Sequence, residues 1–117
     1  MSNISINFSE NILSINDKEI EFEFCIKEFI EFKESIVVLL EIPSNIKYNN
    51  NIFCIDKLCN VIWQVGNVYD VTKGENQPYT YIDISDEKNC IVAGDSLGVD
   101  YFINIETGIP EYSGVSK

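Results

Sequence analysis

The sequence of 117 residues predicts an all-β domain built from antiparallel hairpins. Three observations predict this fold class. Apolar and polar residues alternate with the period of two that is typical of half-buried strands, the apolar runs are short and bounded by turn residues, and one strand–turn–strand pattern recurs along the chain. No segment has the composition of an interdomain linker, so we expect a single domain over residues 1–117.

The first clear alternation is KEIEFEFCI, residues 18–26. It places its apolar residues on one face of an extended chain and three glutamates on the other, which predicts one half-buried strand. These glutamates are Glu19, Glu21 and Glu23. For residues 25–34 two interpretations stay open. We favour a strand that runs into a turn near Lys33 and Glu34, and the alternative is a short helical turn.

The next elements follow from short apolar runs. Residues 35–42 form a continuous apolar run that ends at Pro43, which predicts a strand buried on both faces. After a polar loop, residues 51–65 predict a hairpin, and residues 66–78 are the longest connection. Three further strands are expected within residues 79–84, 89–94 and 99–106, separated by polar turns. In total we expect nine or ten short strands.

An internal repeat supports the hairpins. Residues 12–22, 52–63 and 102–112 each contain an apolar strand ending in Ile, then a polar turn, an Ile or Val, and an aromatic residue two or three positions further on. The closing aromatic residues are Phe22, Trp63 and Tyr112. Residues 36–38 and 91–93 extend the last two copies backwards, so the unit is strand, loop, strand, turn, strand.

This pattern resembles the outer hairpin of β-propeller blades of the quinoprotein and WD-repeat type. The matching residues are Ile52, Phe53, Ile55, Asp56, Val61 and Trp63 in one copy, and Phe102, Ile105, Glu106, Thr107, Gly108 and Tyr112 in another. A closed propeller needs more strands than this chain can supply. The resemblance therefore implies a sandwich or open barrel of antiparallel hairpins with blade-like repeats, or a fold completed by self-association.

One residue departs from the pattern. Cys59 stands where the blade hairpin has a turn glycine. Asn60, beside it, is the residue that we expect to accept the left-handed backbone.

The amino-acid composition narrows the classes of function that we expect for the protein. The chain has 19 acidic residues against eight lysines, a net charge of -11, and neither arginine nor histidine. Such a surface repels nucleic acid and anionic membranes and attracts basic proteins. Histidine supplies most general acid–base catalysis at neutral pH, and arginine the bidentate recognition of phosphate. We therefore expect no enzyme, no cofactor and no metal site.

The four cysteines, Cys25, Cys54, Cys59 and Cys90, contain no C-x-x-C spacing and are interpreted as small buried apolar residues. The N-terminus lacks a secretory signal pattern, and the most apolar run is too short for a membrane span. We therefore expect a cytoplasmic protein whose thiols stay reduced.

The candidate partner-binding residues are carboxylates: Glu19, Glu21, Glu23, Glu28, Glu31, Asp83, Asp86 and Glu87. Strand-borne carboxylates at intervals of ~6.6 to 6.8 Å match lysine and arginine on a basic partner. The alternative is a solvated strand face that protects a sheet edge. In kind, the chain resembles the small acidic immunity proteins of bacterial toxin systems, which implies a basic partner such as a nuclease toxin. The alternative function is a self-associating module of blade-like hairpins, a homo-oligomer.

Overall fold

Antiparallel strands form the framework of the described part of the protein. In the computed structural model, the described residues, 5–66 and 78–115, form eleven strands and no helix. The strands belong to three antiparallel sheets. The N-terminal sheet contains β1 (Ile6–Ser9), β2 (Ile12–Ile15) and β3 (Lys18–Glu21). The middle sheet contains β4 (Ile26–Phe32), β5 (Ser35–Leu40), β6 (Ile52–Ile55) and β7 (Val61–Gln64). The C-terminal sheet contains β8 (Tyr79–Ser85), β9 (Cys90–Asp95), β10 (Val99–Ile103) and β11 (Pro110–Val115). The predicted all-β fold class is confirmed.

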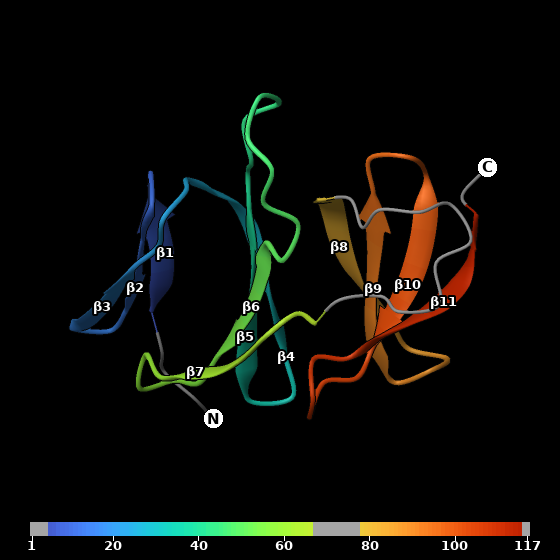
Figure 1. Cartoon of the computed structure of the whole chain (residues 1–117). Coiled ribbons are helices and arrows are strands. Elements are labelled where there is room, and N and C mark those ends of the chain that lie inside the picture. Colours follow the sequence, from blue (N-terminus) through green and yellow to red (C-terminus); the bar gives the residue numbers. More distant parts are fainter. Residues whose placement is uncertain (1–4, 67–77, 116–117) are drawn as a thin grey trace.

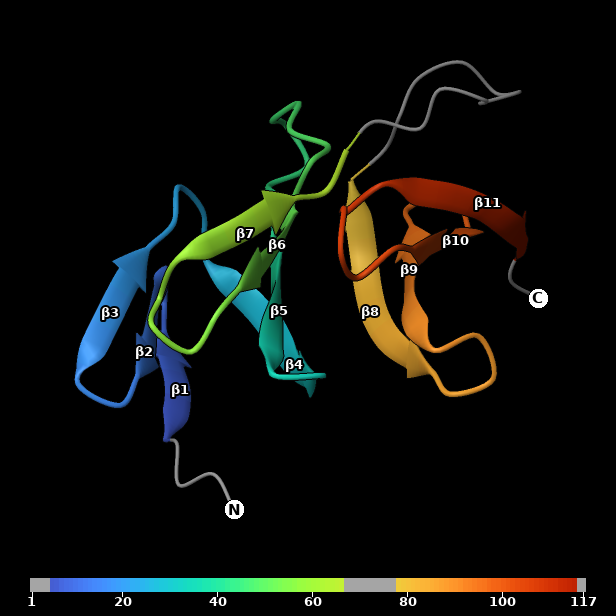
Figure 2. The ribbon, with the colours of Figure 1, turned by 90° about the horizontal axis from the view of Figure 1, so that it is seen from below.

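The three sheets stand side by side, with the middle sheet between the other two (Figures 1 and 2). Its two faces contribute to two separate cores. Val37, Leu39 and Cys54 pack toward the C-terminal sheet, whereas Ile36 and Val38 pack toward the N-terminal sheet. Because neighbouring residues of β5 point to opposite faces, this strand is buried on both sides, as its continuous apolar run predicts.

The internal repeat corresponds to the outer hairpin of each sheet. Its three copies form β2–β3, β6–β7 and β10–β11. In the middle and C-terminal sheets the four strands pair in their sequence order, which is the meander of a propeller blade. The predicted repeat of antiparallel hairpins is therefore confirmed, and the sheets stack without closing into a barrel.

The alternating segment 18–26 is two strands, so the prediction of one strand there is wrong. β3 ends at Glu21, the chain bends at Glu23, and β4 begins at Ile26 in a different sheet. The alternation continues through the bend because Phe22 and Ile26 enter the same core between the N-terminal and middle sheets. Residues 26–32 are a strand that runs into a turn at Lys33 and Glu34, which is the interpretation that we favoured. Both turn residues have a positive φ.

Cys59, not Asn60, takes the left-handed backbone in the β6–β7 turn, with φ of 67°. The turn repeats the one between β9 and β10. The Asp56 carboxylate accepts bonds from the N–H groups two and four residues later, as Asp95 does in a turn where Gly98 has φ of 84°. The hydrogen bonds from Asn60 lower the pKa of Asp56. Cys59 therefore occupies the position of Gly98.

The cysteines are not all buried, which corrects the sequence interpretation. Cys54 is fully buried, Cys59 and Cys90 are partly exposed, and Cys25 is exposed. Cys25 lies in the connection between β3 and β4, outside the strands of both sheets. All four are free thiols. The described residues also form no helix with the length and hydropathy needed to cross a membrane.

Candidate functional site

The outer face of the C-terminal sheet, which points away from the middle sheet, combines carboxylates with aromatic and aliphatic side chains. One row crosses all four strands: Asp83 on β8 pairs with Val92 on β9, which pairs with Phe102 on β10, which pairs with Glu111 on β11. Val92 and Phe102 are half-buried, and both acids at the ends of the row are exposed. The row therefore has an apolar centre between two carboxylates.

A second row beside it is organised by a glycine. Tyr81 on β8 pairs with Gly94 on β9, which pairs with Asp100 on β10. A Cβ atom at Gly94 would lie 2.0 Å from the Tyr81 ring, so the ring lies directly over the glycine. The Tyr81 hydroxyl donates to Asp100 Oδ1 at 2.5 Å. This contact fixes the aromatic ring across the sheet while leaving 36% of the residue exposed.

We call these residues the carboxylate–aromatic face: Tyr81, Asp83, Val92, Asp100, Phe102 and Glu111. At its margin the ammonium group of Lys88 lies 5.9 Å from the centroid of the Phe102 ring. The face therefore already holds one cation against an aromatic ring. Burial raises the pKa of the nearby Cys90 thiol, with Lys88 lowering it and Glu111 raising it.

The structure distributes the predicted carboxylates over several places. Asp83 belongs to the carboxylate–aromatic face, and Asp86 and Glu87 are exposed in the turn that follows β8. Glu19 and Glu21 project from β3 at the opposite end of the stack. The expected row of carboxylates on one strand is therefore limited to these two residues.

The other three predicted glutamates lie near the middle sheet. Glu23 lines a shallow hollow of about 750 Å³ together with Glu10, Glu41 and the ring of Phe24. Glu28 and Glu31 lie on β4, an edge strand of the middle sheet; Glu31 is exposed and Glu28 is partly buried.

The opposite end of the stack is polar. On the outer face of the N-terminal sheet, the two rows are Asn7, Ser14 and Glu19, and Ser9, Ile12 and Glu21. These rows contain no aromatic residue. An end sheet with a polar outer face acts as a cap in stacked folds. The two end faces therefore differ in chemistry: Ile12 is the one apolar residue in these two rows, whereas the C-terminal face has an aromatic centre.

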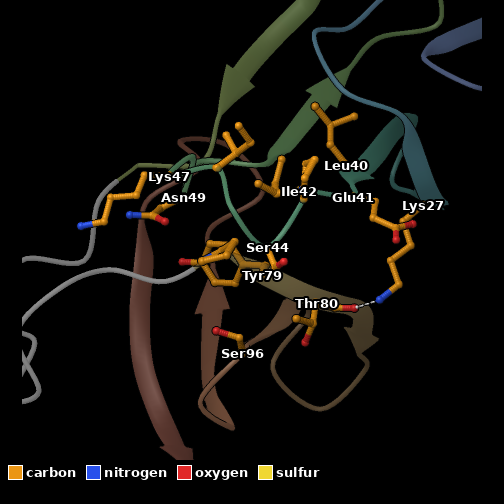
Figure 3. Close-up of a pocket in the computed structure, with 13 residues that line it drawn as sticks. Lys27, Leu40, Glu41, Ile42, Ser44, Lys47, Asn49, Tyr79, Thr80 and Ser96 are labelled. Atoms are coloured by element: carbon orange, nitrogen blue, oxygen red, sulfur yellow. Dashed lines mark hydrogen bonds between the residues drawn. The ribbon is translucent and has the colours of Figure 1, made fainter.

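A hollow of about 480 Å³ lies where the middle and C-terminal sheets meet (Figure 3). Lys27 of β4 crosses it and donates to the carbonyl oxygen of Thr80 on β8 at 2.7 Å. The ring of Tyr79 forms part of its wall, and burial strongly raises the pKa of this phenol. The hydrogen bond between Lys27 and Thr80, both of which line the hollow, connects the middle sheet to the C-terminal sheet. Elsewhere in the described residues, no three thiol or carboxylate groups converge as metal ligands would.

Five residues of the carboxylate–aromatic face are absent from the predicted set: Tyr81, Val92, Asp100, Phe102 and Glu111. The period of two offered a partial signal, because it places Tyr81 with Asp83, and Asp100 with Phe102, on a common face of their strands. The sequence did not show which face of each strand points outward.

Fold and face together define a small all-β protein of stacked, blade-like sheets with one polar end and one carboxylate–aromatic end. The chain belongs to the family described as Domain of unknown function (DUF7957), whose model matches residues 1–114. Comparisons with curated proteins and with solved structures found no match.

Proposed function

We propose that this protein is a non-enzymatic acidic binding protein that inserts its carboxylate–aromatic face into the basic cleft of a partner, and that it serves as a toxin-neutralising immunity protein. The observation that carries the proposal is the row Asp83–Val92–Phe102–Glu111, an apolar centre between two exposed carboxylates. The absence of histidine and arginine from the sequence supports a role without catalysis.

The anatomy of this face matches that of a protein interface. Interfaces commonly have an aromatic centre, where water is excluded, and a polar rim. Here Phe102 and Val92 are half-buried in the free protein, and Tyr81 presents a ring held by Gly94 and Asp100. A partner that covers these side chains would remove them from water, and the fixed Tyr81 ring would lose little conformational entropy.

The charge of the face selects a basic partner. Lysine and arginine can lay their aliphatic stems on Phe102 and Val92 while their charged ends reach Asp83 or Glu111. A net charge of -11 also steers a basic protein toward the molecule over long distances. A nuclease toxin presents such a basic cleft, because it must bind the phosphates of its substrate.

Self-association through this face is disfavoured by the same charges. Two copies that met face to face would bring Asp83, Asp100 and Glu111 of each copy against the same acids of the other. Stacking one copy's C-terminal sheet on the other's N-terminal sheet would oppose them to Glu19 and Glu21. The face therefore favours a basic partner over a second copy.

The test measures binding to the product of the adjacent gene, the candidate toxin. We expect the double charge reversal Asp83→Lys with Glu111→Lys to weaken binding about tenfold or more, because it opposes lysines to a basic cleft. Raising the salt concentration should weaken binding of the unchanged protein. Isothermal titration calorimetry at low and high salt measures both effects.

The matched control is the double reversal Glu19→Lys with Glu21→Lys, which changes the net charge by the same amount at the polar end of the stack. It should reduce the association rate through the lost overall charge and leave the dissociation rate nearly unchanged. Equal loss of affinity in both variants would contradict the proposed face, and the absence of any binding by the unchanged protein would contradict the proposed partner.

A further inference from the structure

In the part of the chain that the structure describes, the N-terminal sheet has one strand fewer than its neighbours. Aligning the three copies of the repeat makes β2 equivalent to β6 and β10, and β3 equivalent to β7 and β11. β1 then takes the position of β5 and β9. The middle and C-terminal sheets carry a further strand beyond this position, β4 and β8 respectively, and the described residues provide none beyond β1.

The free edge of β1 exposes unpaired backbone groups. Asn16 N–H donates to the Ser5 carbonyl at 2.8 Å, which sets the phase of the pairing between β1 and β2. Because hydrogen-bonded and non-hydrogen-bonded pairs alternate in an antiparallel ladder, the backbone N–H groups of Ile6 and Phe8 point away from β2. They point into the position that a fourth strand would occupy. β1 also carries no charged side chain or proline that would protect this edge.

Apolar side chains and one carboxylate line the empty position. Phe8 is 37% exposed, and its ring meets the Phe29 ring of β4 edge-on, with 6.1 Å between centroids. In the neighbouring pair of sheets, β8 packs against β4 and β5, and Ile30 and Phe32 of β4 join that core. Phe29 and Glu31 lie on the opposite face of β4, where they pair with Val38 and Ile36.

We propose that the β1 edge accepts an extended segment of the basic partner as a fourth strand of the N-terminal sheet. Backbone bonds to Ile6 and Phe8 would provide affinity, as in β-strand addition. Alternate apolar side chains of the segment cover Phe8 and Phe29, and a lysine or arginine pairs with Glu31. The proposal rests on the proposed function for the charge of the partner, while its site is separate from the carboxylate–aromatic face.

Charge favours a partner's segment over a second copy of this chain. A second copy would bring another net charge of -11 toward Glu31, whereas a basic segment neutralises it. The exposed Glu31 carboxylate has an apolar neighbour, Phe29, on the same face of β4, so a lysine stem can pack beside its own ion pair.

The probe is a synthetic peptide with the sequence of residues 25–33, the strand that fills the equivalent position in the middle sheet. Serine replaces its cysteine, and lysines replace its two glutamates. We expect the peptide to slow amide hydrogen exchange at Ile6 and Phe8 by about tenfold or more, measured by NMR on the full chain. Glu31→Lys should weaken this protection at a given peptide concentration about fivefold to tenfold.

The matched variants Ile6→Pro and Ile6→Ala separate the contribution of the outward backbone N–H group of residue 6 from that of its side chain. Both lose the isoleucine side chain, and only proline also loses the outward N–H, so Ile6→Ala should bind the peptide and Ile6→Pro should not. Protection that appears without peptide as protein concentration rises would overturn the proposal in favour of a second copy, and unchanged exchange at Ile6 and Phe8 would overturn it outright. Neither result affects the charge-reversal test at Asp83 and Glu111, so the two proposals fail separately.

Discussion

Glycine positions in the turns determine where single side chains can lie. Gly108 has φ of 75°, and a Cβ atom there would come within 2.5 Å of the Trp63 ring. The indole N–H of Trp63 donates to the Ile105 carbonyl at 2.6 Å, so this ring joins the middle sheet to the turn between β10 and β11. The glycine is therefore needed for two reasons, its backbone conformation and the space that the ring fills.

Two alanine substitutions separate the cost of the left-handed backbone from the cost of displacing the Trp63 ring. Gly98 also has a positive φ, but a Cβ atom there would meet no atom within 4 Å. We expect Gly98→Ala to lower the free energy of unfolding by about 1 to 2 kcal/mol, the cost of a left-handed residue with a side chain. Gly108→Ala should cost about 2 kcal/mol more, because the Trp63 ring must move. Urea denaturation followed by circular dichroism measures both, and equal losses would contradict the role of Trp63.

At the level of elements, a buried amide connects two sheets. Asn51, fully buried just before β6, donates from Nδ2 to the carbonyl oxygens of Leu40 and Tyr79 at 2.8 and 2.9 Å. Its Oδ1 accepts from the Tyr79 N–H at 2.9 Å. The side chain thus satisfies backbone groups at the end of β5 and the start of β8, where the middle and C-terminal sheets meet. These groups would otherwise be buried without partners.

Removing this amide should be costly. Asn51→Ala leaves buried backbone groups of Leu40 and Tyr79 unpaired, so we expect a loss of about 3 kcal/mol or more in the free energy of unfolding. The neighbouring substitution Asn50→Ala removes a partly buried bond to the Val65 carbonyl and should cost about 1 kcal/mol. Thermal or urea unfolding compares the two variants. A loss at Asn51 no larger than that at Asn50 would show that water replaces the amide.

At the level of the whole molecule, the main feature is the large excess of negative charge. Nineteen acids against eight lysines produce mutual repulsion that the folded state must withstand. One described ion pair, Lys57 with Glu34 at 2.6 Å, joins the β6–β7 turn to the β4–β5 turn. Because Glu34 is largely exposed, water and salt screen this pair and it adds little stability. The acidic excess therefore does not stabilise the fold, and it agrees with the proposed recognition of a basic partner.

Salt should affect folding and binding in opposite directions. Raising sodium chloride from about 0.05 M to about 0.5 M shortens the range of charge repulsion and should increase the free energy of unfolding. The same change should weaken binding to the proposed basic partner. Urea denaturation and calorimetric titration over one salt series measure the two effects. The variant Glu19→Gln with Glu21→Gln should show a smaller gain in stability, and a stability independent of salt would contradict the role of repulsion.

Much of the fold could be predicted because it depends on local patterns. The period of two indicated strands, polar turns separated them, and the repeat identified the three outer hairpins. One strand was predicted over residues 18–26 because buried and exposed residues continue to alternate through the bend at Glu23. At this bend the chain passes from the N-terminal sheet to the middle sheet. The left-handed residue was assigned to Asn60 on intrinsic preference, whereas the bonds to Asp56 place Cys59 there.

By itself the sequence determined the all-β class, the hairpin repeat, the acidic surface and the absence of histidine and arginine, since these depend on composition and nearest neighbours. Only the tertiary structure decided which side of each strand faces outward. Alternation separates two faces of a strand, but the neighbouring sheet decides which of them is covered. The stacking of three sheets therefore placed Asp83 with Phe102 and Glu111 at one end and placed Glu19 and Glu21 at the other. It also left the edge of β1 without a partner strand from residues 5–66 and 78–115.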